Sequence, residues 1–126
     1  MKNAVILIVA LIILCTSGIW QIKYIEESSI YAISDVEYAA NLVQNDDFAA
    51  ANLHIKELEK TWGSMKTIWT IFITHNEIDY IETALTNLKM YIKLENKEEA
   101  IVYAEILKQN FQHVTRKQKI TIENIF

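Results

Sequence analysis

Apolar residues recur at alternating steps of three and four along most of this chain, and this spacing restricts its fold more than any other feature. Four segments carry the pattern, each separated from the next by a short polar break. Such spacing places the apolar side chains on one face of an α-helix. The chain has no proline and only two glycines in 126 residues, which nearly excludes the tight turns of β-hairpins. The sequence therefore predicts an all-α protein.

Each repeating segment predicts an amphipathic helix with one buried apolar face. The four predicted faces are Ile25, Ser29, Ala32, Val36, Ala39 and Val43; Phe48, Ala51, Ile55, Leu58, Trp62, Met65, Trp69 and Phe72; Ile78, Ile81, Leu85, Leu88 and Ile92; and Ala100, Ala104, Leu107, Phe111 and Val114. The breaks between them are short, at residues 44–47, around Thr74 and at residues 94–97. Short connections make successive long helices antiparallel neighbours, so we predict an antiparallel four-helix bundle of two helical hairpins.

The two predicted hairpins resemble each other when the sequence is shifted by 49 residues. Because 49 is a multiple of seven, heptad spacing accounts for much of this match. The independent evidence is that "NDDF" and "NKEE" fall close together at the starts of the second and fourth helices. The sequence thus contains a weak internal repeat.

An uncharged apolar run, Asn3–Ile22, precedes the helical segments and is bracketed by Lys2 and Lys23. As a helix its 20 residues extend roughly 30 Å, the thickness of the hydrocarbon core of a bilayer. Trp20 lies where an interfacial aromatic residue is expected. A cleaved signal peptide is the alternative, but the run is long for one and continues past the small residues that a peptidase would need. We therefore predict a transmembrane anchor over residues 1–22 and a bundle domain over residues 23–126.

The orientation of the anchor is predicted from the few residues ahead of it. So short an N-terminal tail favours a cytoplasmic N-terminus, with the bundle on the other side of the membrane. The single cysteine, Cys15, lies inside the apolar run, so the chain can form no internal disulfide.

Charge and motifs argue against nucleic-acid binding and against catalysis. The net charge is −4, and the one basic cluster, Arg116–Lys119, lies near the end of a predicted helix, where it complements the helix dipole. None of the three histidines belongs to a Glu-x-x-His or His-x-x-x-His motif, and the chain has no glycine-rich phosphate loop and no nucleophile-elbow serine. We predict no enzymatic activity and no cofactor.

The stretch "ITHNEID" at residues 73–79 predicts a helix start and offers the best candidate for an ion site. Thr74 and Glu77 have the spacing of a capping box, in which the threonine hydroxyl accepts from the amide of Glu77 and the carboxylate accepts from the amide of Thr74. His75, Asp79 and Glu82 share one polar face of the predicted helix. A solvated helix face is the plainer interpretation of these three residues, and a surface cation site is the alternative.

Three tyrosines lie seven residues apart on the first predicted helix: Tyr24, Tyr31 and Tyr38. They form a stripe roughly opposite its small-residue face. Tyrosine is enriched at protein interfaces, so the stripe is a candidate partner surface. The alternative is a broad buried face with the tyrosine hydroxyls at its rim.

Several stretches resemble a known bacterial family named domain of unknown function four-three-six-three. The stretches are "NDDFAAANLHIKELEKTW", "IFITHNEIDYIE", "ENKEEA" and "ITIENIF", and the resemblance extends over nearly the whole chain. His75, Glu77, Ile78 and Asp79 match the central motif of the family, whereas Gly63 departs from its pattern. The resemblance implies a short protein with one N-terminal membrane segment and a helical remainder, and it implies no particular activity.

Two hypotheses for the function follow. In the first, the protein is a membrane-anchored, non-catalytic subunit that binds another membrane protein, or a second copy of itself, through its extracytoplasmic bundle. In the second, the bundle senses a ligand or an ion at the stripe of His75, Asp79 and Glu82.

Overall fold

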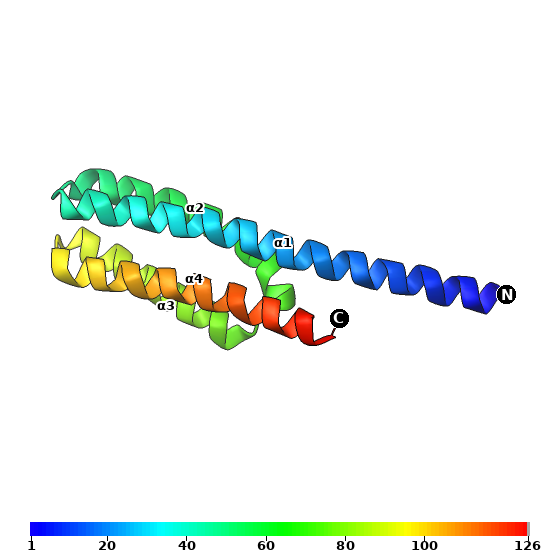
Figure 1. The fold of residues 1–126 in the computed structure, drawn as a ribbon. Helices are drawn as coiled ribbons and strands as arrows, with labels where there is room; N and C mark the ends of the chain where they lie inside the picture. The colour runs from blue at the N-terminus through cyan, green and yellow to red at the C-terminus, as the bar shows by residue number, and fades with distance from the viewer. Residues whose placement is uncertain (126) are drawn as a thin grey trace.

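The computed structural model describes residues 1–125 as four α-helices, and no residue in that range forms a β-strand (Figure 1). The helices are α1 (Lys2–Gln44), α2 (Phe48–Phe72), α3 (His75–Lys93) and α4 (Lys97–Ile125). The all-α prediction is confirmed, and the three breaks occur where the sequence placed them. Phe126, the last residue of the predicted bundle domain, lies outside the described residues.

The apolar run and the first bundle helix form one uninterrupted helix of 43 residues, α1. The boundary that we expected between residues 22 and 23 therefore falls inside a helix. Neither glycine nor proline occurs between Ile19 and Gln44, so the backbone has no residue at which a helix usually ends. By length and composition the first part of α1 could cross a membrane, and it is not buried inside the protein.

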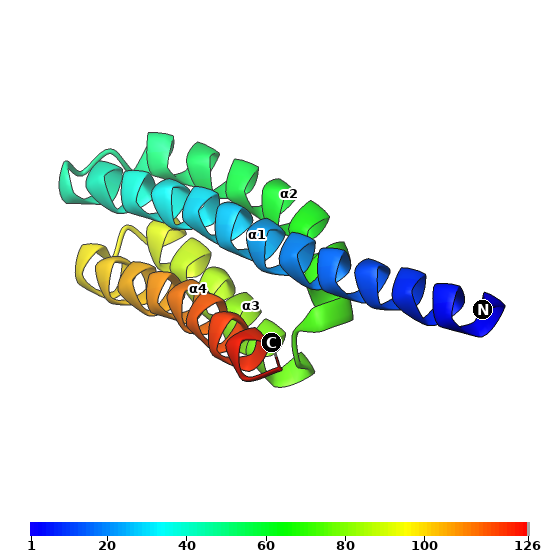
Figure 2. The same cartoon turned by 45° about the vertical axis from the view of Figure 1, so that its right-hand side comes forward.

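The four helices pack in a ring, with α1 against α2 and α4, and α3 also against α2 and α4 (Figures 1 and 2). Successive helices are antiparallel, as in a four-helix bundle. The bare part of α1 leaves the bundle at the end that also holds the α2–α3 connection and the C-terminal turns of α4. We call this the anchor end, and we call the opposite end, with the α1–α2 and α3–α4 connections, the distal end.

The predicted apolar faces form the core. All six residues of the first face are buried, as are all five of the face on α3 and all five of the face on α4. On α2 the six central residues are buried, whereas Phe48 and Phe72 at its ends are only half-buried. Burial of these side chains supplies most of the stabilising free energy of such a bundle.

An aromatic cluster occupies the core between α2 and α4. The rings of Trp62, Trp69 and Phe111 meet edge to face, with centroids 5.5–5.8 Å apart. The small residues of α1 border this cluster and bind it directly. Trp69 Nε1 donates to Ser28 Oγ (3.0 Å), and Ser29 Oγ donates to the carbonyl of Phe111 (3.1 Å). The predicted core positions of both tryptophans are confirmed.

The two distal connections have the same structure, 49 residues apart. Asp46 and Glu95 both adopt positive φ angles, of 61° and 55°. One residue later, Asp47 and Asn96 cap α2 and α4 by accepting from the amides of Ala50 (3.2 Å) and Glu99 (3.3 Å). The backbone hydrogen bonds that close the two turns also correspond one to one. The weak repeat in the sequence therefore reflects two equivalent hairpins.

Replacing Gly63 by alanine should stabilise the bundle. Gly63 lies inside α2 and is exposed, and a Cβ atom added there would meet no other atom within 4 Å. Since glycine costs about 1 kcal/mol relative to alanine in a helix interior, Gly63→Ala should raise the free energy of unfolding by about 0.5–1 kcal/mol. Thermal unfolding followed by circular dichroism measures the change. Ser64→Gly at the neighbouring exposed position is the control and should lower the melting temperature; a lower melting temperature for Gly63→Ala would contradict the prediction.

Candidate interaction surfaces

The tyrosine stripe is divided in the structure. Tyr24 is half-buried, with its ring stacked on Trp20 at a centroid distance of 5.5 Å. Tyr31 and Tyr38 remain 57% and 55% exposed on the outer face of α1. The ring of Tyr38 rests against His54 of α2 (4.7 Å), and Asp35 Oδ1 lies 3.3 Å from His54 Nε2. Two of the three predicted tyrosines are thus available to a partner, and a neighbouring helix supports one of them.

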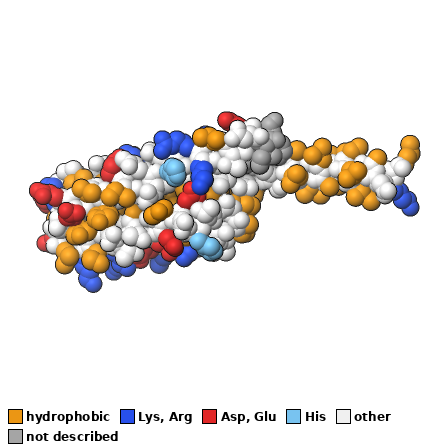
Figure 3. Space-filling model, turned by 90° about the horizontal axis from the view of Figure 1, so that it is seen from below, with side chains coloured by type: hydrophobic (Ala, Val, Ile, Leu, Met, Phe, Trp, Pro, Cys, Tyr) orange, Lys and Arg blue, Asp and Glu red, His pale blue; other side chains and the backbone are white. Residues whose placement is uncertain are grey.

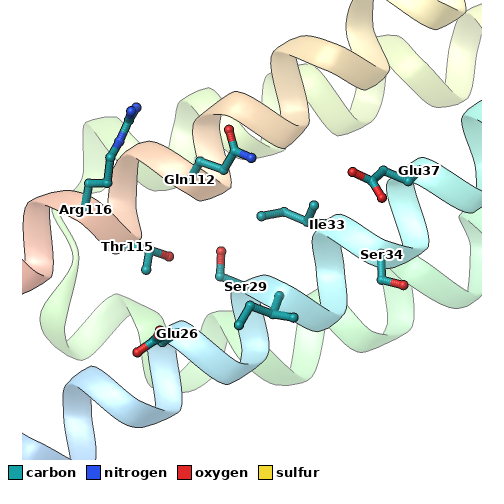
Figure 4. A pocket seen from close by; sticks show the side chains of 9 residues that line it. Glu26, Ser29, Ile33, Ser34, Glu37, Gln112, Thr115 and Arg116 are labelled. Carbon is teal, nitrogen blue, oxygen red and sulfur yellow. The ribbon is translucent and has the colours of Figure 1, made fainter.

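A groove of about 660 Å³ lies between α1 and α4, beside the exposed face of α1 (Figure 4). Ile30 and Ile33 line it from α1, and Ser29 and Thr115 face each other across it. Charged side chains, including Glu37 and Arg116, stand at its rim.

The rim of the groove also carries an ion pair. Glu37 of α1 lies 3.3 Å from Lys108 of α4, and this contact raises the pKa of Lys108 above its usual value. Because Lys108 is protonated over the whole physiological range in either case, its charge stays constant there. The groove therefore has an apolar lining and fixed charges at its edge.

The outer face of α1 combines these features. Ile30, Tyr31 and Tyr38 are each more than half exposed, and all three lie on the helix that carries the apolar run. Sequence spacing identified the tyrosines. It missed Ile30, because the groove depends on how closely α4 approaches, and heptad spacing within α1 carries no information about that distance.

A second apolar patch covers the distal half of α3 and α4, on the face seen in Figure 3. The rings of Tyr91 and Tyr103 stack across the two helices with centroids 5.4 Å apart. Val102 and Ile106 on α4 are exposed, and so is Leu94 in the connection between α3 and α4. Sequence analysis missed this patch, because its members lie outside the regular apolar faces.

The three residues of the candidate ion stripe have different surroundings in the structure. His75 and Asp79 are exposed at the start of α3, whereas the Glu82 carboxylate forms an ion pair with Lys66 of α2. Within residues 1–125, no group of three or more histidine, cysteine, aspartate or glutamate side chains has the geometry to hold a metal ion. All three residues lie on α3, but the carboxylate of Glu82 pairs with Lys66.

The cap at the start of α3 is confirmed only in part. Thr74 caps the helix, and its hydroxyl accepts from the amide of Glu77 (3.4 Å). We had expected the Glu77 carboxylate to accept from the amide of Thr74, but it has other partners. The carboxylate accepts from Lys117 Nζ of α4 (3.0 Å) and lies 3.8 Å from His113 Nε2. Glu77 is only 9% exposed, so a cationic partner on α4 compensates the burial of its charge.

A double-mutant cycle on Glu77 and Lys117 should reveal this coupling between α3 and α4. Because Lys117 is half exposed, we expect Glu77→Gln and Lys117→Met to couple by only about 0.5–1 kcal/mol in the free energy of unfolding. Chemical denaturation of the four variants provides the measurement. The more exposed pair Glu59–Lys89 (2.9 Å) is the matched control and should couple less strongly. Equal coupling in the two pairs would contradict the structural role assigned to Glu77.

Comparison with known proteins assigns the chain to a family. The model of the family described as Domain of unknown function (DUF4363) matches residues 19–125, which include the whole bundle and the last part of the apolar run. No curated protein and no solved structure matches the chain. The resemblance noted in the sequence is thereby confirmed, and the protein belongs to the DUF4363 family.

Proposed function

We propose that this protein is a membrane-anchored, non-catalytic subunit whose helical bundle binds another membrane protein. The observation that supports the proposal most directly is the continuity of α1. One helix carries both a bare apolar segment and the outer face formed by Ile30, Tyr31 and Tyr38. A partner helix packed against the apolar segment in the bilayer could continue along this outer face without a change of direction.

The chemistry of the outer face suits a protein partner. Tyrosine side chains offer large rigid contact areas, each with a polar hydroxyl, and they are enriched at protein interfaces. The neighbouring groove accepts apolar side chains, and its charged rim adds specificity. The proposed orientation has the N-terminus in the cytoplasm and the bundle on the opposite side of the membrane.

Removing the exposed rings should release the partner without unfolding the bundle. We expect Tyr31→Ala combined with Tyr38→Ala to reduce recovery of a stoichiometric membrane partner by at least about tenfold, since two interface tyrosines commonly contribute more than 1.4 kcal/mol. The measurement is a mild-detergent pull-down of the tagged full-length protein from native membranes, quantified by mass spectrometry. Circular dichroism should show unchanged helicity.

The matched control removes exposed apolar side chains from a different face. Val102→Ala combined with Ile106→Ala trims the patch on α3 and α4, and it should leave the partner bound. Loss of the partner from this control alone would move the binding surface to α3 and α4. Recovery of the protein without any partner from wild-type membranes would count against the proposed function itself.

Cysteine labelling tests the proposed orientation. With Cys15 replaced by serine, Leu94→Cys provides a single exposed thiol at the distal end. A membrane-impermeant maleimide should label this thiol in intact cells, because the proposed position of the bundle is outside the cytoplasm. Asn3→Cys in the same background is the control and should react only after permeabilisation. The reverse pattern would contradict the proposed orientation.

A further inference from the structure

The anchor end of the bundle overlaps the apolar run of α1. Residues 1–14 are exposed, but from Cys15 onward α1 begins to be covered, and Cys15, Gly18, Gln21 and Ile22 are all half-buried. The overlap is fixed by a hydrogen bond, because Gln21 Nε2 donates to Gln118 Oε1 of α4 (2.7 Å). Since α4 runs antiparallel to α1 and continues to Ile125, its last turns lie beside the end of the uncharged run.

Large apolar side chains are exposed at this same level. Ile71 in the last turn of α2 is 71% exposed, and Ile120 on α4 is 58% exposed. Trp20 of α1 lies close to the end of α2, because its ring meets that of Phe72, the neighbour of Ile71, at a centroid distance of 6.5 Å. The carbonyl of Phe72 in turn accepts from Gln118 Nε2 (3.4 Å). Three helices therefore present apolar side chains next to the apolar run.

Two of the basic residues at this end form ion pairs. Lys117 pairs with the buried Glu77, and Lys119 pairs with Glu26 of α1 (3.0 Å). The surface therefore combines apolar side chains with charged ones, and two of its basic residues are paired with carboxylates. Such a surface suits the interfacial layer of a bilayer whether or not the lipids are anionic.

We propose that the anchor end of the bundle is itself a lipid-binding surface, with Ile71 and Ile120 inserted among the lipid headgroups. The inference rests on the proposed membrane anchoring and adds a second, non-spanning contact to it. To place the whole run Asn3–Ile22 across a hydrocarbon core of about 30 Å, the covered residues from Cys15 to Ile22 have to enter the membrane as well. The ends of α2 and α4, which pack beside these residues, then enter at least the interfacial layer, which is about 5–8 Å deep on each side.

Lipid is the occupant that the geometry favours, because these side chains extend a surface that already faces lipid. Trp20 marks the expected depth, since tryptophan prefers the headgroup level. The bundle thus rests directly on the bilayer, and no flexible linker separates the two.

Depth-dependent fluorescence quenching tests this contact on the full-length protein. Single cysteines are introduced at Ile71 and Ile120 in a Cys15→Ser background, labelled with an environment-sensitive fluorophore and reconstituted into vesicles of phosphatidylcholine, with and without phosphatidylglycerol. Both positions are exposed, so the label should not disturb the core. We expect blue-shifted emission at both positions and loss of most of that emission when nitroxide-labelled lipid is included.

Two matched positions make the outcome decisive. Leu94→Cys, at a side chain that is 66% exposed at the distal end, should show neither change. Val9→Cys, in the bare part of α1, should be quenched strongly because it lies in the hydrocarbon core. One outcome would overturn the inference but leave the anchor intact. In it, Val9 is quenched, whereas Ile71 and Ile120 show no more quenching than Leu94.

The remaining outcomes separate the inference from the proposed function. No quenching at Val9 would overturn the membrane anchor, and the lipid contact with it. A signal at Ile71 and Ile120 that requires phosphatidylglycerol would overturn the apolar basis of the contact. Quenching in both lipid compositions would support it.

Discussion

The packing of the whole protein depends on α1, a single helix with two different parts. One part is bare and apolar, and the other packs in the bundle. The first part of α1 carries apolar side chains in every direction, whereas from Ile25 onward one face is buried in the bundle and the rest of the surface mixes charged and apolar residues. The change in pattern occurs without a change in backbone, so the direction of the apolar segment also fixes the direction of the bundle axis. Two of the other helices, α2 and α4, pack directly against the buried face of this one element, and α3 completes the ring by packing against both of them.

The small residues on that face allow the close packing. Ser29, Ala32 and Ala39 are completely or almost completely buried, and their size lets α4 approach near enough for a serine hydroxyl to reach a backbone carbonyl. The large rings come from the opposite side, where Trp62, Trp69 and Phe111 fill the space that small side chains leave. Small residues facing large ones in this way produce the density of a native core.

Much of this arrangement could be predicted from periodicity. Heptad-like spacing identified the buried faces of all four helices, and Thr74 marked the start of α3, because both signals depend only on residues close in sequence. The partner of Glu77 could not be predicted in the same way. Lys117 lies 40 residues away on α4, and the contact depends on the rotation of one helix against another. The groove beside Ile30 and the patch around Tyr103 depend on the same interhelical geometry.

The internal repeat, too, could be predicted only in part from residues close in sequence. The sequence suggested two equivalent hairpins through two short polar stretches, and the equivalence became clear only from matched φ angles and caps at Asp46 and Glu95. Acidic side chains occupy both positive-φ positions, where glycine is the usual choice. Local sequence alone therefore gives little indication of how these turns are built.

Because α1 has no break, the bundle turns as a rigid body with the apolar segment. From Ile22 to Gln44 the helix rises roughly 33 Å, so a change in anchor tilt of about 10° would carry the distal turns sideways by roughly 6 Å. Transmembrane helices occupy tilts of roughly 0–40°, and their neighbours in the bilayer help to set the angle. With the anchor in a bilayer as proposed, a partner that alters this angle would move the distal surface of α3 and α4 without deforming the bundle.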